Sequence, residues 1–140
     1  MNTLDDTTMT RILQAAKVIA VVGLSPKPGR ASYRVAHYLQ QAGYRIIPIR
    51  PGGMEIFGEK SYPSLKEIPG DVAVDIVDVF RRADQTPPIA HGAVAIGAGL
   101  LWLQSGIVNE DAMKVALRGG LRSVQDLCLM VEHRRLLGGG

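Results

Sequence analysis

The sequence has only one cysteine, Cys128, which excludes an intramolecular disulfide and a multi-cysteine zinc site. It contains no apolar run of the roughly 18 residues that a membrane helix needs. Its first residues lack the basic region of a secretion signal. We therefore expect a cytoplasmic protein without a membrane partner. A hydrophobic fraction of 46% and a charged fraction of 21% are typical of a globular domain, and we expect residues 1–140 to form a single one.

Acidic residues are absent between Lys17 and Arg50, whereas from Pro51 to Gly140 eleven acidic residues accompany nine basic ones. Positive charge is therefore concentrated in one segment, where it would attract an anionic ligand. Six basic residues supply this charge: Lys17, Lys27, Arg30, Arg34, Arg45 and Arg50.

The same segment has the pattern of a phosphate-binding turn. An apolar run over residues 18–22 leads through Gly23 into a polar turn, and a helix is expected to open near Ser32. This order exposes backbone N–H groups and a helix N-terminus to a phosphate. The turn and helix start also carry basic candidates for phosphate contacts: Lys27, Arg30 and Arg34.

Strand and helix patterns alternate along the chain, which predicts a parallel sheet with right-handed crossovers. We expect an α/β fold, a Rossmann-like doubly wound parallel sheet of about five strands in the order 3-2-1-4-5 with helices on both faces. The expected strands are 18–24, 44–49, 74–80, 100–104 and 122–125. The expected helices are 8–16, 32–42, 88–98, 110–117 (with Asn109 as N-cap) and 127–137, and a loop-rich insert at 51–69 has a short helical turn at 65–68.

Several polar residues are expected to be structural. Pro48 predicts an irregular end to the second strand. Asp75 and Asp78 alternate with apolar residues, so one face or one end of the third strand should not be fully buried; three residues apart, they face opposite sides and cannot act as an acid/base pair. Cys128 has no adjacent base and is interpreted as a partly buried structural thiol. The three histidines lack the spacing of metal ligands: His37, His91 and His133.

A NAD-binding fingerprint requires Gly-x-Gly-x-x-Gly and an acidic residue at the end of the second strand. The chain keeps the first glycine, Gly23, and ends its second strand at Arg50. The arginine disfavours NAD and favours a ribose that carries a phosphate, which a guanidinium can hold bidentately. Two ligands fit this pattern, NADP with its 2′-phosphate and coenzyme A with its 3′-phosphate and pyrophosphate.

Six segments resemble the small stand-alone CoA-binding proteins, which are similar to the CoA-binding domain of the succinyl-CoA synthetase alpha subunit. The segments follow in order over nearly the whole chain: Val-Val-Gly-Leu-Ser at 21–25, Ser-Tyr-Arg-Val at 32–35, Gly-Tyr-Arg-Ile-Ile-Pro at 43–48, Asp-Ile-Val-Asp-Val-Phe-Arg at 75–81, Trp-Leu-Gln-Ser-Gly at 102–106 and Cys-Leu-Met-Val-Glu-His at 128–133.

The resemblance implies that the CoA nucleotide lies over the first turn and beside the ends of the second and third strands. The residues so implied are Gly23, Leu24, Ser25, Lys27, Ile49, Arg50, Pro51, Val79, Phe80 and Arg81. Ser32 in the second segment, Arg30 and Arg34 near the turn, and Gln104 and Gly106 after the fourth strand complete the candidate site. Phe80 is a candidate adenine platform. We expect a β-branched residue at position 23 to remove binding while largely sparing the fold.

The chain departs from many relatives in two places. It has Arg50-Pro51 where they have Asn-Pro, which affects contacts to the ribose or its phosphate. It has Asp126-Leu127-Cys128 where they have Asp-Arg-Cys, which removes a positive charge near Cys128.

The leading hypothesis is non-catalytic binding of coenzyme A or acyl-CoA, with a protein partner or weak homo-oligomer as a further expectation. Enzyme activity is not expected, because no nucleophile elbow is present and the synthetase uses a phosphorylated histidine in a separate domain that this sequence lacks. The alternative is an NADP-dependent oxidoreductase or a nucleotide-responsive regulator. Nucleic acid is not expected, because the basic residues cluster at a turn without a recognition helix or aromatic stacking motif.

Overall fold

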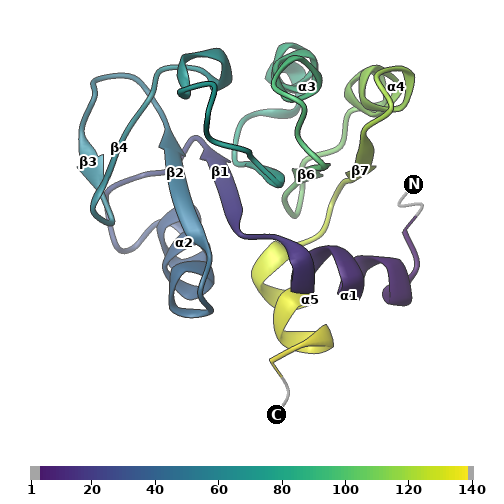
Figure 1. Ribbon diagram of the computed structural model, residues 1–140, viewed down its shortest axis with the longest axis horizontal. Helices are drawn as coiled ribbons and strands as arrows, with labels where there is room; N and C mark the ends of the chain where they lie inside the picture. Colours follow the sequence, from purple (N-terminus) through teal and green to yellow (C-terminus); the bar gives the residue numbers. More distant parts are fainter. Residues whose placement is uncertain (1–3, 139–140) are drawn as a thin grey trace.

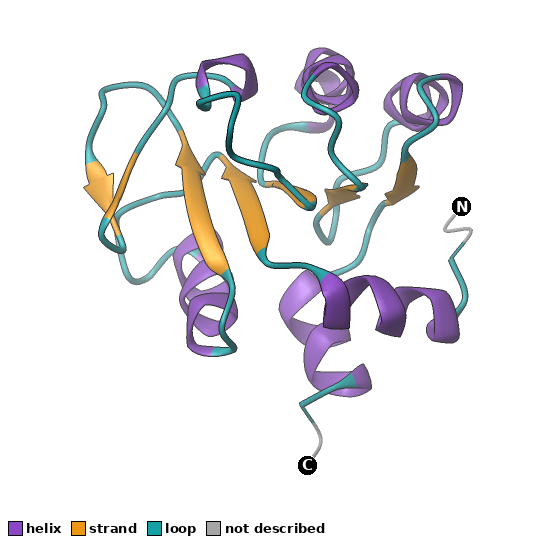
Figure 2. Cartoon of the chain, in the orientation of Figure 1, coloured by secondary structure: helices purple, strands orange, loops and turns teal. Residues whose placement is uncertain are grey.

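The computed structural model describes residues 4–138 and shows a parallel sheet between two layers of helices (Figures 1 and 2). The expected α/β, Rossmann-like class is therefore confirmed. The sheet strands are β1 (Val18–Val22), β2 (Arg45–Ile49), β5 (Ile76–Val79), β6 (Leu100–Leu103) and β7 (Arg122–Val124), and β3 (Glu55–Ile56) and β4 (Glu59–Lys60) form a separate hairpin. The helices are α1 (Asp6–Ala15), α2 (Ala31–Gln41), α3 (Thr86–Ala95), α4 (Glu110–Arg118) and α5 (Leu129–Leu136), with 3-10 turns η1 (Leu65–Glu67) and η2 (Ala83–Gln85).

The strands lie in the order β2-β1-β5-β6-β7, which is 2-1-3-4-5 when the sheet strands are numbered along the chain. The third strand, β5, thus pairs with β1, whereas the expected order 3-2-1-4-5 placed it outside β2. Pro48 explains the difference. Its carbonyl faces the outer edge of β2 and accepts a hydrogen bond from Tyr62 N (3.0 Å), so its nitrogen, which has no hydrogen, faces that edge too. Because a proline cannot complete a central ladder, β2 is an edge strand.

Residues of the central strands alternate between two buried faces, as expected for a parallel sheet covered on both sides. One face carries Ile19 and Trp102 and is covered by α1, α2 and α5. The other carries Ala20 and Leu101 and is covered by η1, α3 and α4. Apolar contacts to both helix layers stabilise the sheet. They also hold the C-terminal ends of β1, β2 and β5 next to one another, and the candidate site lies at these ends.

Helix starts follow from local capping. Asn109 is the expected N-cap of α4, and its side chain accepts a hydrogen bond from Ala112 N at 2.8 Å. Helix α1 begins two residues earlier than expected because Asp5 acts as its N-cap and accepts a bond from Thr8 N at 2.7 Å. Within residues 4–138, none of the helices combines the length and apolar character needed to cross a bilayer.

The β3–β4 hairpin was missing from the sequence expectation. Phe57 (φ 55°) and Gly58 (φ 75°) both adopt positive φ at its turn, as in a type I′ hairpin. Phenylalanine is unusual there, and tertiary contacts hold it in place. Its ring packs against Tyr33 of α2 with centroids 4.9 Å apart, and its carbonyl accepts a bond from Gln40 Nε2 at 3.2 Å.

The expectation that one face or one end of the strand at 74–80 is not fully buried is met at Asp75, near its start, and not at Asp78. The side chain of Asp78 is fully buried, next to Val21 on β1 and Trp102 on β6, and neither carboxyl oxygen has a hydrogen-bond partner among residues 4–138. Burial raises the pKa of this carboxyl well above its ordinary value. Asp75 lies just before the strand, partly exposed, and accepts bonds from the backbone N–H of Lys17 at 2.8 Å and Val18 at 2.9 Å.

Candidate functional site

Gly23 brings the ends of three strands together. Its N–H donates to the carbonyl of Ile49 at 2.9 Å, and its φ is +85°. A Cβ at this position would overlap the backbone carbonyl of Phe80. Glycine is therefore needed for the close approach of the β1–α2 and β5–α3 connections. The expectation that valine at position 23 largely spares the fold was wrong, because the space it needs is occupied by backbone.

The β1–α2 turn is held by its own serines. Ser25 N donates to Ser32 Oγ at 3.0 Å, and Lys27 N donates to Ser25 Oγ at 3.1 Å. Ser32 is buried, so its hydroxyl stabilises the turn from the protein side and is not exposed on its surface. These bonds fix the path of the chain into α2 before any ligand binds.

The start of α2 has the electrostatic character of an anion site. Its N-cap is Arg30, which makes no side-chain capping bond, and its first turn contains no acidic residue. By contrast, α1 and α4 have capping side chains and acidic first turns. Because the first N–H groups of a helix have no partner within the helix, the start of α2 carries partial positive charge that no carboxylate in its first turn offsets.

Basic side chains surround this turn and contact neutral carbonyls. Arg34 Nη1 donates to Gly29 O at 2.6 Å, and Arg50 donates to Leu24 O at 3.3 Å and to Pro51 O at 3.4 Å. Arg81 donates to Gln85 Oε1 at 3.1 and 2.6 Å. The ion pairs found within residues 4–138 involve other arginines: Arg45, Arg82 and Arg135. The guanidinium charges around the turn are therefore available to an anion.

Two candidates present little but backbone at the site. The side chains of Leu24 and Val79 are buried in the two cores, so a ligand above the sheet would meet their main chain. Ile49 is also buried, but it lines a neighbouring pocket. Phe80 is partly buried against the core beneath α2 and α5, and Pro51, Lys27 and Arg30 are exposed.

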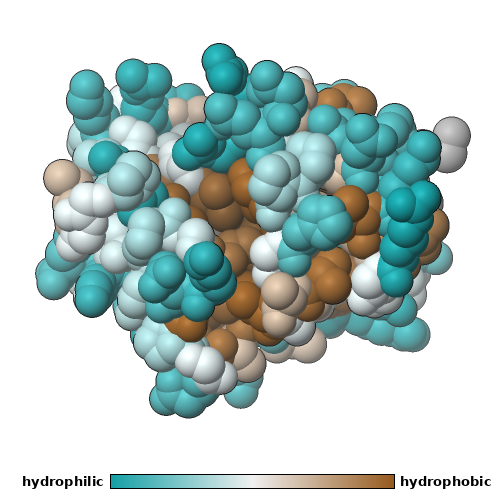
Figure 3. Space-filling model, turned by 90° about the horizontal axis from the view of Figure 1, so that it is seen from above, coloured by the Kyte–Doolittle hydropathy of each residue, from teal (hydrophilic) through white to brown (hydrophobic). Residues whose placement is uncertain are grey.

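A pocket of about 640 Å³ adjoins the turn on the side of η1 and α3. Val22, Ile49, Leu65 and Ile89 supply apolar surface. Polar groups on its lining belong to Ser64, Lys66, Arg81, Asp84 and Gln85. Figure 3 shows this face of the molecule, with apolar surface at its centre between hydrophilic borders. The volume lies within the range of small-molecule sites.

Sequence reasoning identified Ile49 and Arg81 of this pocket and missed its other residues. Those from η1 and α3 are separated in the chain from the β1–α2 turn by the hairpin insert, and no local pattern marks them. The fold alone brings them beside Val22.

Gln104 and Gly106 are tied into the C-terminal part of the chain. Gln104 is buried, and its Oε1 accepts a bond from Leu129 N at the start of α5 at 3.0 Å. Gly106 N donates to Asp126 Oδ1 at 2.7 Å, and Asp126 has a φ of +61°. These bonds account for both residues without a ligand.

Cys128 is the N-cap residue of α5 and is partly buried against the core, in agreement with its structural interpretation. His133 is buried and shares a 2.9 Å hydrogen bond with Tyr38 OH. Burial lowers the pKa of this histidine. Among residues 4–138, no group of His, Cys, Asp and Glu is arranged to hold a metal ion.

The parallel sheet and its helices define a Rossmann-like α/β class of domain. The family model of the CoA binding domain matches residues 17–134, and the chain belongs to this family. The resemblance to CoA-binding proteins noted in the sequence is thereby confirmed.

Two curated relatives differ in size. The uncharacterized protein YneT of Bacillus subtilis is 46% identical over 122 residues, which cover 87% of this chain and 89% of YneT. The alpha subunit of ADP-forming acetate–CoA ligase II of Pyrococcus furiosus is 39% identical over 129 residues, or 84% of this chain, and the match covers 28% of that subunit. The chain is therefore similar both to a small protein and to one part of a longer ligase subunit.

A solved structure of a hypothetical protein from Pyrococcus horikoshii is 39% identical and superimposes with a TM-score of 0.91. The match covers 96% of this chain and 94% of that one.

Proposed function

We propose that this chain binds coenzyme A, with the anionic nucleotide over the β1–α2 turn, and that it does so without catalysing a reaction. The observation that carries the proposal is the start of α2, which has no capping side chain and is surrounded by Lys27, Arg30, Arg34, Arg50 and Arg81. Coenzyme A carries a pyrophosphate and a 3′-phosphate, which match both the helix N-terminus and the guanidinium groups.

The neighbouring pocket suits the base of the nucleotide. Apolar side chains such as Leu65 and Ile89 would contact the faces of an adenine ring, and Ser64 and Gln85 offer hydrogen-bonding groups at its edge. Arg81 lines this pocket and lies beside Gly23, so it would act between base and phosphates. In this arrangement Phe80 supports the turn from the core.

Binding of an acyl-CoA is an extension of the same proposal, because the nucleotide portion is common to both ligands. The NADP alternative is less favoured, because the turn keeps one glycine of the dinucleotide fingerprint and the chain belongs to the CoA binding domain family. The match covers 28% of the acetate–CoA ligase subunit, so we do not carry the reaction named for that protein over to this chain.

Calorimetric titration tests the proposal and the role of the 3′-phosphate. Coenzyme A should bind about 10- to 100-fold more tightly than 3′-dephospho-coenzyme A, because loss of a charge-assisted contact costs about 1.5–3 kcal/mol. Arg50→Ala should remove most of this difference, whereas Arg122→Ala, on β7 at the other edge of the sheet, should retain it.

Equal affinities of the wild type for the two ligands at matched salt would show that the 3′-phosphate is not recognised. Tighter binding of NADPH than of coenzyme A would favour the alternative function. Absence of measurable binding to any of the three would contradict the proposal as a whole.

A further inference from the structure

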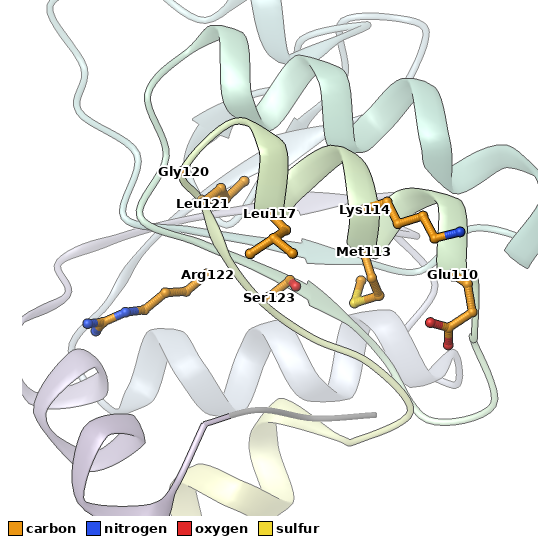
Figure 4. Close-up of a pocket in the computed structure, with 8 residues that line it drawn as sticks. All are labelled: Glu110, Met113, Lys114, Leu117, Gly120, Leu121, Arg122 and Ser123. Carbon is orange, nitrogen blue, oxygen red and sulfur yellow. The ribbon is translucent and has the colours of Figure 1, made fainter.

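A second concave surface lies at the opposite edge of the sheet, between α4 and β7. This groove has a volume of about 400 Å³ and is drawn in Figure 4. Met113 and Leu117 project from α4 on the side of β7, and Leu121 leads into the strand. Because it lies beside the last strand of the sheet, away from the β1–α2 turn, the proposed coenzyme A site does not account for it.

At the groove, the apolar side chain of Leu117 and the unpaired edge of β7 are exposed next to each other. Leu117 has 77% of its surface exposed. Apolar residues on one face of a helix usually pack against a core instead. Strand β7 pairs with β6 on one side, and no strand within residues 4–138 pairs with its other side. An exposed edge next to apolar surface is a typical site of association with another chain.

The distribution of charge along α4 indicates that a second copy of the same helix is the partner. The helix begins with Glu110 and Asp111 and carries Lys114 and Arg118 farther along, and all four are exposed. Two copies of α4 side by side in the antiparallel sense bring the acidic start of each toward the basic part of the other. A parallel arrangement would instead oppose like charges. The surface is thus complementary to itself under a two-fold rotation.

We propose that the α4–β7 groove is the interface of a symmetric homodimer, in which Leu117 of each copy covers Met113 and Leu117 of the other and the two β7 edges run antiparallel. Eight residues line the groove, compared with about 20–30 residues a side in a standard complex, so the interface we propose is small. The dimer is therefore weak: it forms at high protein concentration and dissociates into monomers on dilution.

Sedimentation equilibrium over a range of concentrations tests this proposal. The wild type should show a reversible monomer–dimer equilibrium. Leu117→Lys should raise the dissociation constant at least about tenfold, and Lys114→Glu combined with Arg118→Glu should do the same by leaving α4 with acidic charge alone. The matched control is Val131→Lys, which places the same charge on α5 at a residue 48% exposed.

Circular dichroism should confirm that each variant is folded, as expected for exposed positions. A wild type that stays monomeric up to about 1 mM would overturn the proposal and leave the groove to a different protein. A dimer that persists unchanged in both α4 variants would also overturn it, because the interface would then lie elsewhere. Neither result bears on coenzyme A binding, which the titrations measure independently.

Discussion

Replacing Gly23 with alanine should lower the free energy of unfolding by at least about 3 kcal/mol. Two effects add. Alanine at a φ of +85° is strained, and its Cβ would overlap the carbonyl of Phe80, which is backbone and can move only with β5. Relief of the overlap would separate β1 from β5 at the end of both strands. Valine should be worse, because a β-branched side chain is still less tolerant of positive φ.

Gly29→Ala is the matched control on the same turn. No atom lies within 4 Å of a Cβ built at Gly29, so this change should alter the free energy of unfolding by less than about 0.5 kcal/mol. Chemical denaturation of both variants measures the difference. If Gly23→Ala proves as stable as Gly29→Ala, the close contact between the two connections is not part of the native fold.

Asp78→Val should stabilise the protein by about 1–3 kcal/mol at neutral pH, because it replaces an unpartnered buried carboxyl with an apolar side chain of similar size in a strand. Burial raises the pKa of Asp78 in the folded state, so the folded protein holds this proton more tightly than the unfolded chain does. This tighter proton binding adds to the free energy of unfolding in full below the unfolded pKa of 3.8, and the added stability is lost as the pH rises through the folded pKa.

Denaturation curves recorded across pH measure this contribution, with Asp78→Asn as the isosteric control. The wild type should lose stability relative to Asp78→Asn as the pH rises above about 4, by up to about 1.4 kcal/mol per pH unit until the folded pKa is passed. A difference that does not vary with pH, together with a destabilised Asp78→Val, would mean that the carboxylate has a partner in solution.

The element pattern could be predicted from the sequence because its signals are local. Asn109 caps α4 as expected, and the strands and helices of the main sheet lie within a few residues of their expected bounds. The strand order could not be obtained from periodicity, which does not specify which strands pair. Pro48 was the informative residue: a proline whose nitrogen faces the outer edge of β2 is compatible with an edge strand and not with the interior position that the order 3-2-1-4-5 requires.

Part of the candidate site could likewise be predicted from local sequence, and part of it depends on tertiary packing. Gly23 and the basic residues of the turn follow one another in sequence or flank strand ends, so their proximity could be anticipated. The pocket beside Arg81 depends on where η1 and α3 pack, and the hairpin that precedes η1 is held by contacts between Phe57 and α2. Such contacts are tertiary and leave no local pattern. Asp78 was misjudged because alternation along a strand indicates polarity of a face only when that face is near solvent.

The central claim is that coenzyme A binds over the β1–α2 turn, and the most direct test is its effect on the backbone amide resonances of the ¹⁵N-labelled protein. Saturation with coenzyme A should shift the amides of residues 23–34 and 80–85 most, since these segments surround the start of α2 and the adjoining pocket. The amides of α4 and β7 should change little. A saturated complex whose largest shifts lie outside these two segments, or a spectrum that coenzyme A leaves unchanged, would contradict the account.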